Sequence, residues 1–298
     1  MSEPTSVLVT GATGFIGRRL VPELVARGMA VRAMTRRPEA YDGPGEPVGA
    51  DVNDPETLTE ALKGVDVAVY LVHSLDDPDF ERKDAEAARG FGRAAAEAGV
   101  SQIVYMGGLG ADGDQLSPHL RSRREVEGLL GEAGVPVTVL RAAIVVGAGG
   151  ISWELTRQLV KNLPAMVVPR WVSTRTQPIA VDDVVRYLAG VIGREEASGR
   201  VFEIGGADRL TYLEMLQVAA ELRGGRRVPI VRVPVLTPRL SSYWLALVTD
   251  VDTTTGRNLI DSMSTEVVVT DHSIRDVVPG EPLTYAEAVR RALAEGAD

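Results

Sequence analysis

The chain has 298 residues, a formal charge of −9 from 32 basic and 41 acidic side chains, and no cysteine. The lack of cysteine excludes disulfide bonds, thiolate catalysis, zinc–cysteine sites and iron–sulfur clusters. The acidic balance argues against nucleic acid as a partner, and no apolar run is long enough to span a bilayer. We therefore expect a cytoplasmic protein with no membrane span and no metal site. We expect it to act on a small molecule as a monomer or homodimer.

Apolar runs alternate with segments of helical period through the first 140 residues. In chain order the expected elements are strand 6–10, helix 15–27, strand 30–35, helix 55–63, strand 65–72, helix 79–98, strand 102–106, helix 119–131 and strand 136–140. Strands that alternate with helices at this spacing predict right-handed βαβ units and a parallel sheet. The predicted fold class is therefore α/β, with a Rossmann-type doubly wound parallel sheet.

The regular alternation of strands and helices ends after Gly147. The expected elements there are helix 153–163, an extended segment 177–181, helix 182–192, strand 200–204, helix 211–222 and a closing helix 287–294. Asp182 and Asp183 are expected as an N-cap pair, and Thr211 as the N-cap of a capping box. We expect residues 1–150 with about 176–206 to form the sheet domain. About 151–175 and 207–298 would form a smaller substrate-binding lobe at its C-terminal side.

A glycine-rich turn follows the first predicted strand and opens the first predicted helix. Gly11 permits the tight turn, Gly14 lets the backbone approach a pyrophosphate, and Gly17 lets the helix pack closely on the sheet. A glycine turn without a ligand is the alternative, but the strand–turn–helix context favours a dinucleotide site. The expected contacts from this turn are Gly11, Thr13, Gly14, Phe15, Ile16 and Gly17.

The residues after the second strand decide which dinucleotide is preferred. An NAD site places an acidic residue there to bind the ribose 2′-hydroxyl, whereas this chain has Arg36 and Arg37, which can pair with a 2′-phosphate. Arginine is abundant in this chain, so ordinary surface positions are the alternative, but their place favours NADP(H). Asp51 and Val52 follow a third strand, expected without set bounds before residue 51, where a carboxylate can accept from the adenine amino group. Asp54 is the better candidate for a helix cap. This strand makes 65–72 the fourth strand and 102–106 the fifth.

Five stretches carry a resemblance to the extended and atypical short-chain dehydrogenase/reductases, and within them to the NmrA-like, YbjT-like NAD(P)H-binding proteins. They are Val9–Gly17, Tyr70–Ser74, Tyr105–Gly110, Leu140–Ala143 and Gln177–Val184. The resemblance covers residues 6–206 and makes the sheet domain the NADP-binding domain. It adds Leu71, Val72, His73, Met106 and Gly107 to the expected cofactor contacts.

Active members of that superfamily use a serine or threonine after the fifth strand and a Tyr-x-x-x-Lys pair on the next helix. The chain has only three lysines, Lys63, Lys83 and Lys161, and none has a tyrosine four residues before it. The usual pair is therefore missing. Gly107 and Gly108 take the place of the serine.

Three residues are candidates for the altered catalytic site. His119 stands at the tyrosine position and could donate a proton, since imidazole titrates near neutrality. Arg123 stands at the lysine position and could hold ribose hydroxyls, although it cannot act as a base. Both could equally be ordinary helix residues. His73 lies at the end of the fourth strand, at the topological switch where ligands bind, or it simply caps a loop.

The expected substrate contacts are Gly108, Trp153, Trp171 and Arg175, with Tyr243 and Trp244 as further apolar walls. Core packing is the alternative for at least one tryptophan. The leading hypothesis is an NADP(H)-dependent oxidoreductase for a small quinone-, enone- or carbonyl-type substrate, because such conjugated acceptors need less proton donation than an isolated ketone. The alternative is a non-catalytic NADP(H) sensor or regulatory protein of the NmrA-like type.

Overall fold

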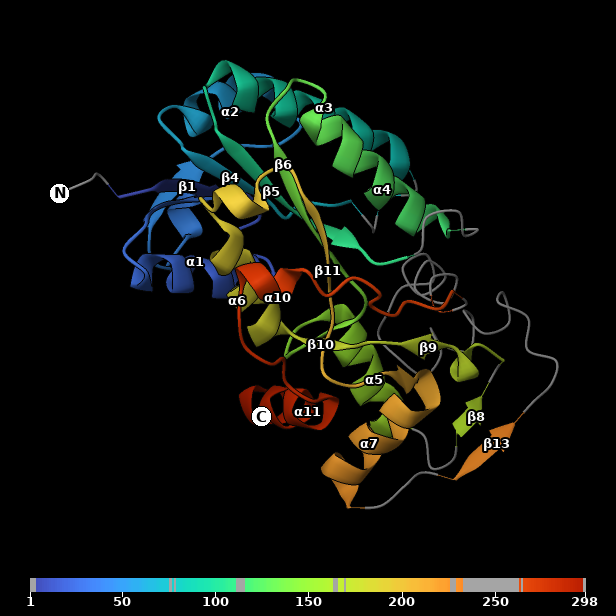
Figure 1. Ribbon diagram of the computed structural model, residues 1–298. Coiled ribbons are helices and arrows are strands. Elements are labelled where there is room, and N and C mark those ends of the chain that lie inside the picture. Colours follow the sequence, from blue (N-terminus) through green and yellow to red (C-terminus); the bar gives the residue numbers. More distant parts are fainter. Residues whose placement is uncertain are drawn as a thin grey trace.

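The computed structural model describes residues 4–74, 77, 79–110, 116–162, 166–168, 170–225, 229–232, 263 and 265–296. A parallel seven-stranded sheet forms its centre, in the order β11-β6-β5-β4-β1-β2-β3 (Figure 1). The strands are β1 (Ser6–Val9), β2 (Ala30–Thr35), β3 (Glu46–Gly49), β4 (Val67–Tyr70), β5 (Gln102–Gly108), β6 (Val137–Ala142) and β11 (Val201–Ile204). The predicted doubly wound parallel sheet is confirmed.

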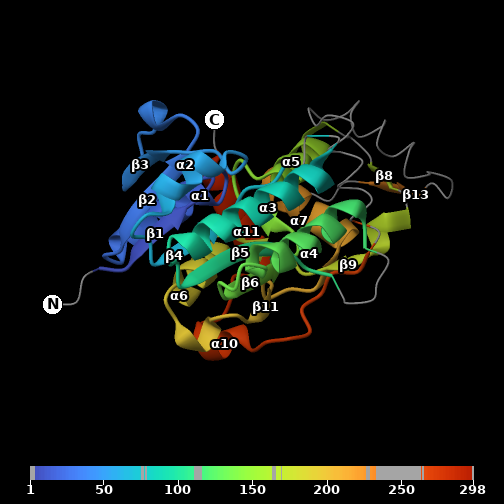
Figure 2. The ribbon, with the colours of Figure 1, turned by 90° about the horizontal axis from the view of Figure 1, so that it is seen from above.

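Helices cover both faces of this sheet (Figure 2). One face carries α1 (Gly17–Ala26), α6 (Val181–Val191) and the short α10 (Ile274–Val277). The other carries α2 (Pro55–Leu62), α3 (Phe80–Glu97) and α4 (Pro118–Gly131), which pack side by side. Every residue of β4 is buried, because this central strand is covered from both sides.

A third apolar cluster lies beyond the carboxyl ends of the strands. It joins α5 (Ile151–Asn162), α7 (Tyr212–Gly224) and α11 (Tyr285–Glu295), which gather below the sheet in Figure 1. The short strand pairs are β7 (Val145–Val146) with β10 (Ile179–Ala180), β8 (Met166–Val168) with β13 (Ile230–Arg232), and β9 (Arg175–Thr176) with β12 (Leu210–Thr211). We propose that this cluster is the core of the smaller lobe, although Ile274 and Val277 pack into the sheet's core instead. None of the helices in the described ranges is suited by length and hydropathy to cross a membrane.

Two predicted helix caps are confirmed. The Asp54 carboxylate accepts a hydrogen bond from the Glu56 backbone N–H at 3.2 Å, just before Pro55 opens α2. Thr211 and Glu214 form the capping box at the start of α7. Both arrangements satisfy N–H groups that the first turn of a helix leaves without partners.

The predicted N-cap pair at Asp182 and Asp183 is wrong. Helix α6 begins at Val181, and its N-cap is Ala180, the last residue of β10. Both carboxylates therefore lie inside the first turn, where the helix dipole also favours negative charge. The Asp183 carboxylate is buried, and it accepts from the Leu283 backbone N–H at 2.8 Å and from Arg186 at 2.9 Å.

Candidate functional site

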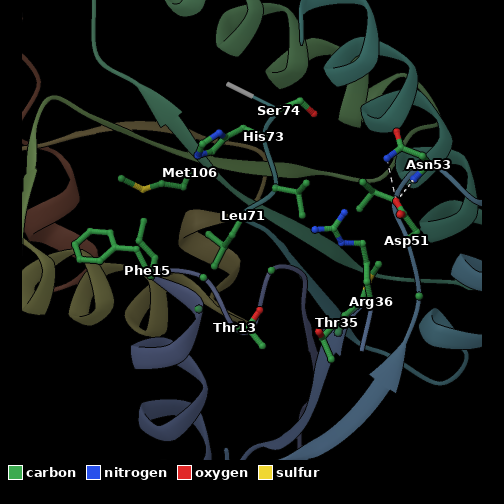
Figure 3. Close-up of a pocket in the computed structure, with 18 of the residues that line it drawn as sticks. Thr13, Phe15, Thr35, Arg36, Asp51, Asn53, Leu71, His73, Ser74 and Met106 are labelled. Atoms are coloured by element: carbon green, nitrogen blue, oxygen red, sulfur yellow. Dashed lines mark hydrogen bonds between the residues drawn. The ribbon is translucent and has the colours of Figure 1, made fainter. Parts of the chain in front are cut away.

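A cavity of about 950 Å³ lies at the carboxyl ends of β1, β2 and β4, where the strand order reverses (Figure 3). In an open α/β sheet this is the place where ligands bind. The residues that line it are Gly11, Thr13, Gly14, Phe15, Ile16, Gly17, Met34, Thr35, Arg36, Arg37, Ala40, Ala50, Asp51, Val52, Asn53, Leu71, Val72, His73, Ser74, Asp77, Lys83, Met106 and Arg123. All of the expected cofactor contacts except Gly107 are among them.

The glycine turn forms the floor of the cavity. Gly11 has a φ of +60°, a left-handed conformation that favours glycine, and its carbonyl accepts from the Gly14 N–H at 2.9 Å. A Cβ at Gly17 would lie 2.2 Å from the Gly11 carbonyl oxygen, so only glycine lets α1 begin this close to the turn. Helix α1 starts at Gly17 without a side-chain cap. Its first N–H groups and its positive dipole end therefore suit an anion such as a diphosphate.

Basic and amide side chains line the cavity beside β2 and β3. Figure 3 shows the Arg36 guanidinium between Leu71 and Asp51, and Arg37 lines the same region. The Asp51 carboxylate accepts from both the backbone N–H and the side-chain amide of Asn53, each at 2.9 Å. Arg36 thus brings a cationic group, and Asp51 an acidic group, to this end of the cavity.

At the other end, two histidines and an arginine come together from β4 and α4. His73 follows β4 and is exposed toward the cavity, whereas His119 lies in the first turn of α4 and does not border it. Arg123, one helical turn after His119, borders the cavity and donates from Nη1 to the Met106 carbonyl at 2.8 Å. The structure thus brings the three candidate catalytic residues into one neighbourhood.

Both imidazoles are neutral at pH 7. Desolvation by the surrounding protein, followed by the Arg123 charge, lowers the pKa of His119 to about 3, and the same two causes lower the pKa of His73. His119 was expected to donate a proton because imidazole titrates near neutrality, and the lowered pKa removes that reason. A neutral imidazole donates a hydrogen bond but holds its proton too firmly to act as a ready acid.

The expected substrate contacts lie elsewhere. Gly107 and Gly108 end β5 outside the cavity wall, and a Cβ on them would meet Glu127 Oε1 and Leu120 Cδ2, each at 2.7 Å. Trp153 is buried in the third apolar cluster, and Arg175 lies on β9 away from the cavity. The side chain of Trp171, together with Tyr243 and Trp244, lies outside the described residues.

Some cavity residues were not expected from the sequence. Asn53, Ser74, Asp77 and Lys83 carry polar groups into the wall. Asn53 stands two positions after Asp51, so its position in the cavity wall could have been predicted from the same loop. Lys83 gave no such signal, because a lysine in the first turn of an amphipathic helix is typical of a solvated face. Within the described residues, no group of three histidine or acidic side chains is placed to hold a metal ion.

We expect His119 to make the folded chain less stable as the pH falls below 6.5. The unfolded histidine titrates near 6.5 and the folded one near 3, so between these values the unfolded state binds more protons. The free energy of unfolding should therefore fall by up to about 2 kcal/mol between pH 7.5 and pH 5. Urea unfolding at both pH values should show a smaller fall in His119→Gln. The exposed His272 supplies the control: His272→Gln should keep the wild-type pH dependence. An equal fall in wild type and His119→Gln would contradict the prediction.

Comparisons with known proteins agree with this geometry. A family model described as NAD(P)H-binding matches residues 11–170. The chain is 28% identical over 240 residues to the ceramide reductase of Caulobacter vibrioides. This match covers 76% of this chain and 73% of that protein. It is 28% identical over 230 residues to the (4-alkanoyl-5-oxo-2,5-dihydrofuran-3-yl)methyl phosphate reductase of Streptomyces griseus, covering 73% of this chain and 74% of that protein.

The comparisons also include an assembly factor and a solved structure of similar fold. A photosystem II assembly factor of Cyanophora paradoxa is 25% identical over 239 residues, covering 77% of this chain and 72% of that protein. Among solved structures, the NADPH-dependent quinone oxidoreductase of Escherichia coli in complex with NADPH superposes with a TM-score of 0.78. That match covers 95% of this chain and 98% of the other at 21% identity, so it speaks for the fold alone.

Proposed function

The chain belongs to the NAD(P)H-binding family, and from this premise we propose that it is an NADP(H)-dependent oxidoreductase. Its substrate would be a small quinone-, enone- or carbonyl-type acceptor. One observation carries the proposal: a single cavity runs from Arg36 and Arg37, past the glycine turn, to His73 and Arg123. A dinucleotide bound along it would have its phosphates at the turn and its reactive end beside the two histidines.

The preference for NADP(H) rests on the end of β2. Arg36 and Arg37 line the cavity at the place where an NAD site needs an acidic residue for the ribose 2′-hydroxyl. A guanidinium there pairs with a 2′-phosphate instead. The NADPH bound in the quinone oxidoreductase of similar fold is in keeping with this preference.

The chemistry expected of the chain's own residues is positioning and charge stabilisation. The bound cofactor would supply the hydride. Arg123, fixed by the Met106 carbonyl, presents its remaining N–H groups to ribose hydroxyls or to the substrate oxygen on which negative charge develops. The neutral imidazole of His73, which lines the cavity, can donate a hydrogen bond to the same region. This set suits conjugated acceptors, and the Streptomyces griseus relative reduces a substrate of the oxo-dihydrofuran class.

Fluorescence titration with NADPH and NADH, followed by NADPH oxidation against quinones, enones and aldehydes, tests this proposal. We expect NADPH to bind at least tenfold more tightly than NADH, and Arg36→Ala to remove most of that difference, since one charged hydrogen bond is worth roughly 1.5–3 kcal/mol. His119→Ala should slow turnover while leaving NADPH binding intact. If NADPH does not bind the wild-type chain, the proposal fails. Equal affinity for both dinucleotides, unchanged in Arg36→Ala, would refute the NADP(H) preference.

A second candidate is a non-catalytic NADP(H)-binding sensor or regulatory protein. The absence of the Tyr-x-x-x-Lys pair and the neutral histidines favour it, and the Cyanophora relative is an assembly factor. This candidate predicts NADPH binding with no oxidation by any acceptor in the panel. Turnover with any one of them would exclude it.

A further inference from the structure

Lys83 lines the cavity, and nothing in the proposed function uses it. It is one of the chain's three lysines and lies in the first turn of α3, with 43% of its side chain exposed. Helix α3 packs on the face of the sheet opposite to α1. Lys83 therefore approaches the cavity from the side opposite to the helix that the glycine turn opens.

Asp77 holds the ammonium group of Lys83 in place. The Lys83 Nζ forms an ion pair and hydrogen bond with the Asp77 carboxylate. The same carboxylate accepts from the Asp79 N–H at 2.8 Å, and the Asp77 N–H donates to the Ser74 carbonyl at 2.9 Å. Asp77 is thus fixed by backbone bonds at the entry to α3. An ammonium has three donors, so pairing with Asp77 leaves others to face a ligand.

The charges of the cavity single out Lys83. Among the described residues that line it, four side chains are cationic (Arg36, Arg37, Lys83 and Arg123) and two are acidic (Asp51 and Asp77), although the whole chain carries a charge of −9. Two of these cations flank the adenosine end, and Arg123 is bound to the Met106 carbonyl. Lys83 is the cation that α3, the helix after β4, contributes to the cavity wall.

We propose that Lys83 is a phosphate-contacting residue of this cavity, held ready by Asp77. A compact, strongly hydrated ammonium on a flexible stem favours hard oxyanions, and a phosphate oxygen is such a ligand. The phosphate would come from the diphosphate of the dinucleotide, clasped between Lys83 and the glycine turn, or from a phosphate carried by the substrate. This inference rests on the proposed dinucleotide binding and names a contact that the proposed function does not require.

The test compares Lys83→Met with Lys63→Met and Lys161→Met, which remove exposed lysines that do not line the cavity. We expect Lys83→Met to raise the Kd for both NADPH and NADH about tenfold, as the loss of one charged hydrogen bond predicts. It should also reduce the dependence of log Kd on log salt, because one cation fewer meets the phosphates. Lys83→Arg should recover most of the affinity, and both control variants should bind as the wild type does.

Asp77→Asn separates binding from structural support. If Lys83 contacts a phosphate, Asp77→Asn should weaken binding less than Lys83→Met does, because the ammonium is still present although its support is lost. An Asp77→Asn variant that weakens binding as much as Lys83→Met does would overturn the proposal, since the ion pair itself would then be what matters. Thermal unfolding monitored by circular dichroism verifies that each variant is folded.

The Kd for NADPH and the KM of a phosphate-bearing substrate together show whether the phosphate belongs to the dinucleotide or to the substrate. Should Lys83→Met leave the Kd for NADPH unchanged but raise the KM of a phosphate-bearing enone, and not that of its dephosphorylated counterpart, the contact is to the substrate. No effect on either quantity overturns the proposal while leaving the proposed function standing. Failure of the wild-type chain to bind NADPH is a different outcome, because it removes the proposed function itself.

Discussion

Replacement of Gly17 by alanine is expected to abolish dinucleotide binding and to destabilise the fold. The new Cβ would lie 2.2 Å from the Gly11 carbonyl oxygen, 2.8 Å from the Ala12 Cα and 2.9 Å from the Gly11 carbonyl carbon. All three are backbone atoms, so no side-chain rotation relieves the clash. Helix α1 must move away from the turn, and its N-terminus then no longer faces the site for the diphosphate.

We expect the Kd for NADPH to rise at least a hundredfold in Gly17→Ala, and the free energy of unfolding to fall by about 1–3 kcal/mol, as in other overpacked sites. The matched control is Gly128→Ala in the middle of α4, where a Cβ would meet no atom within 4 Å. There alanine should leave NADPH binding unchanged and stabilise the helix by up to about 1 kcal/mol. Wild-type affinity for NADPH in Gly17→Ala would show that the turn does not hold the cofactor.

The elements predicted best from the sequence are those with strong local signals. Strand β2 has the predicted bounds, Ala30–Thr35, and the caps at Asp54 and Thr211 lie where side-chain chemistry places them. Strand β3 is harder to locate, because it runs through a stretch rich in glycine and proline. It lies at the sheet edge, pairs only with β2 and is mostly exposed. An edge strand of this kind tolerates Pro47 and needs no apolar alternation.

The part of the cavity wall around the glycine turn was easier to predict from the sequence than the part around His73 and Arg123. The glycine turn, Arg36 and Asp51 follow strand ends within a local motif, so sequence spacing alone places them. The surroundings of His119 come instead from α4 packing against β5 and from the Arg123 side chain. Sequence spacing carries no record of that burial, and the pKa of His119 near 3 follows from it. Lys83 reaches the wall only because α3 starts beside the end of β4.

Glu127 on α4 and Arg141 on β6 form a buried ion pair. Breaking this pair is expected to lower the free energy of unfolding strongly. Arg141 Nη2 donates to Glu127 Oε2 at 2.6 Å, and Arg141 Nε lies 3.1 Å from both carboxylate oxygens. Only 8% of the Glu127 side chain and 14% of the Arg141 side chain is exposed. Gly107 pairs with Arg141 in the sheet, and a Cβ there would lie 2.7 Å from Glu127 Oε1, so glycine makes room for the carboxylate.

Glu127→Ala would remove the carboxylate that Arg141 Nε and Nη2 bind and that also lies 4.0 Å from Arg124 Nε, at an expected cost of up to about 3–5 kcal/mol in the free energy of unfolding. Replacing both partners, as in Glu127→Leu with Arg141→Met, removes the two charges together and should recover part of that loss, because the remaining cost is that of packing and of the other contacts of the two side chains, such as Arg124 with Glu127. Urea unfolding of the wild type, of the single variants Glu127→Leu and Arg141→Met, and of the double variant measures the coupling. If the loss of unfolding free energy in the double variant equals the sum of the losses in the two single variants, the pair contributes no coupling. The predicted result instead has the double variant more stable than Glu127→Ala, since a buried charge costs most when its partner alone is removed.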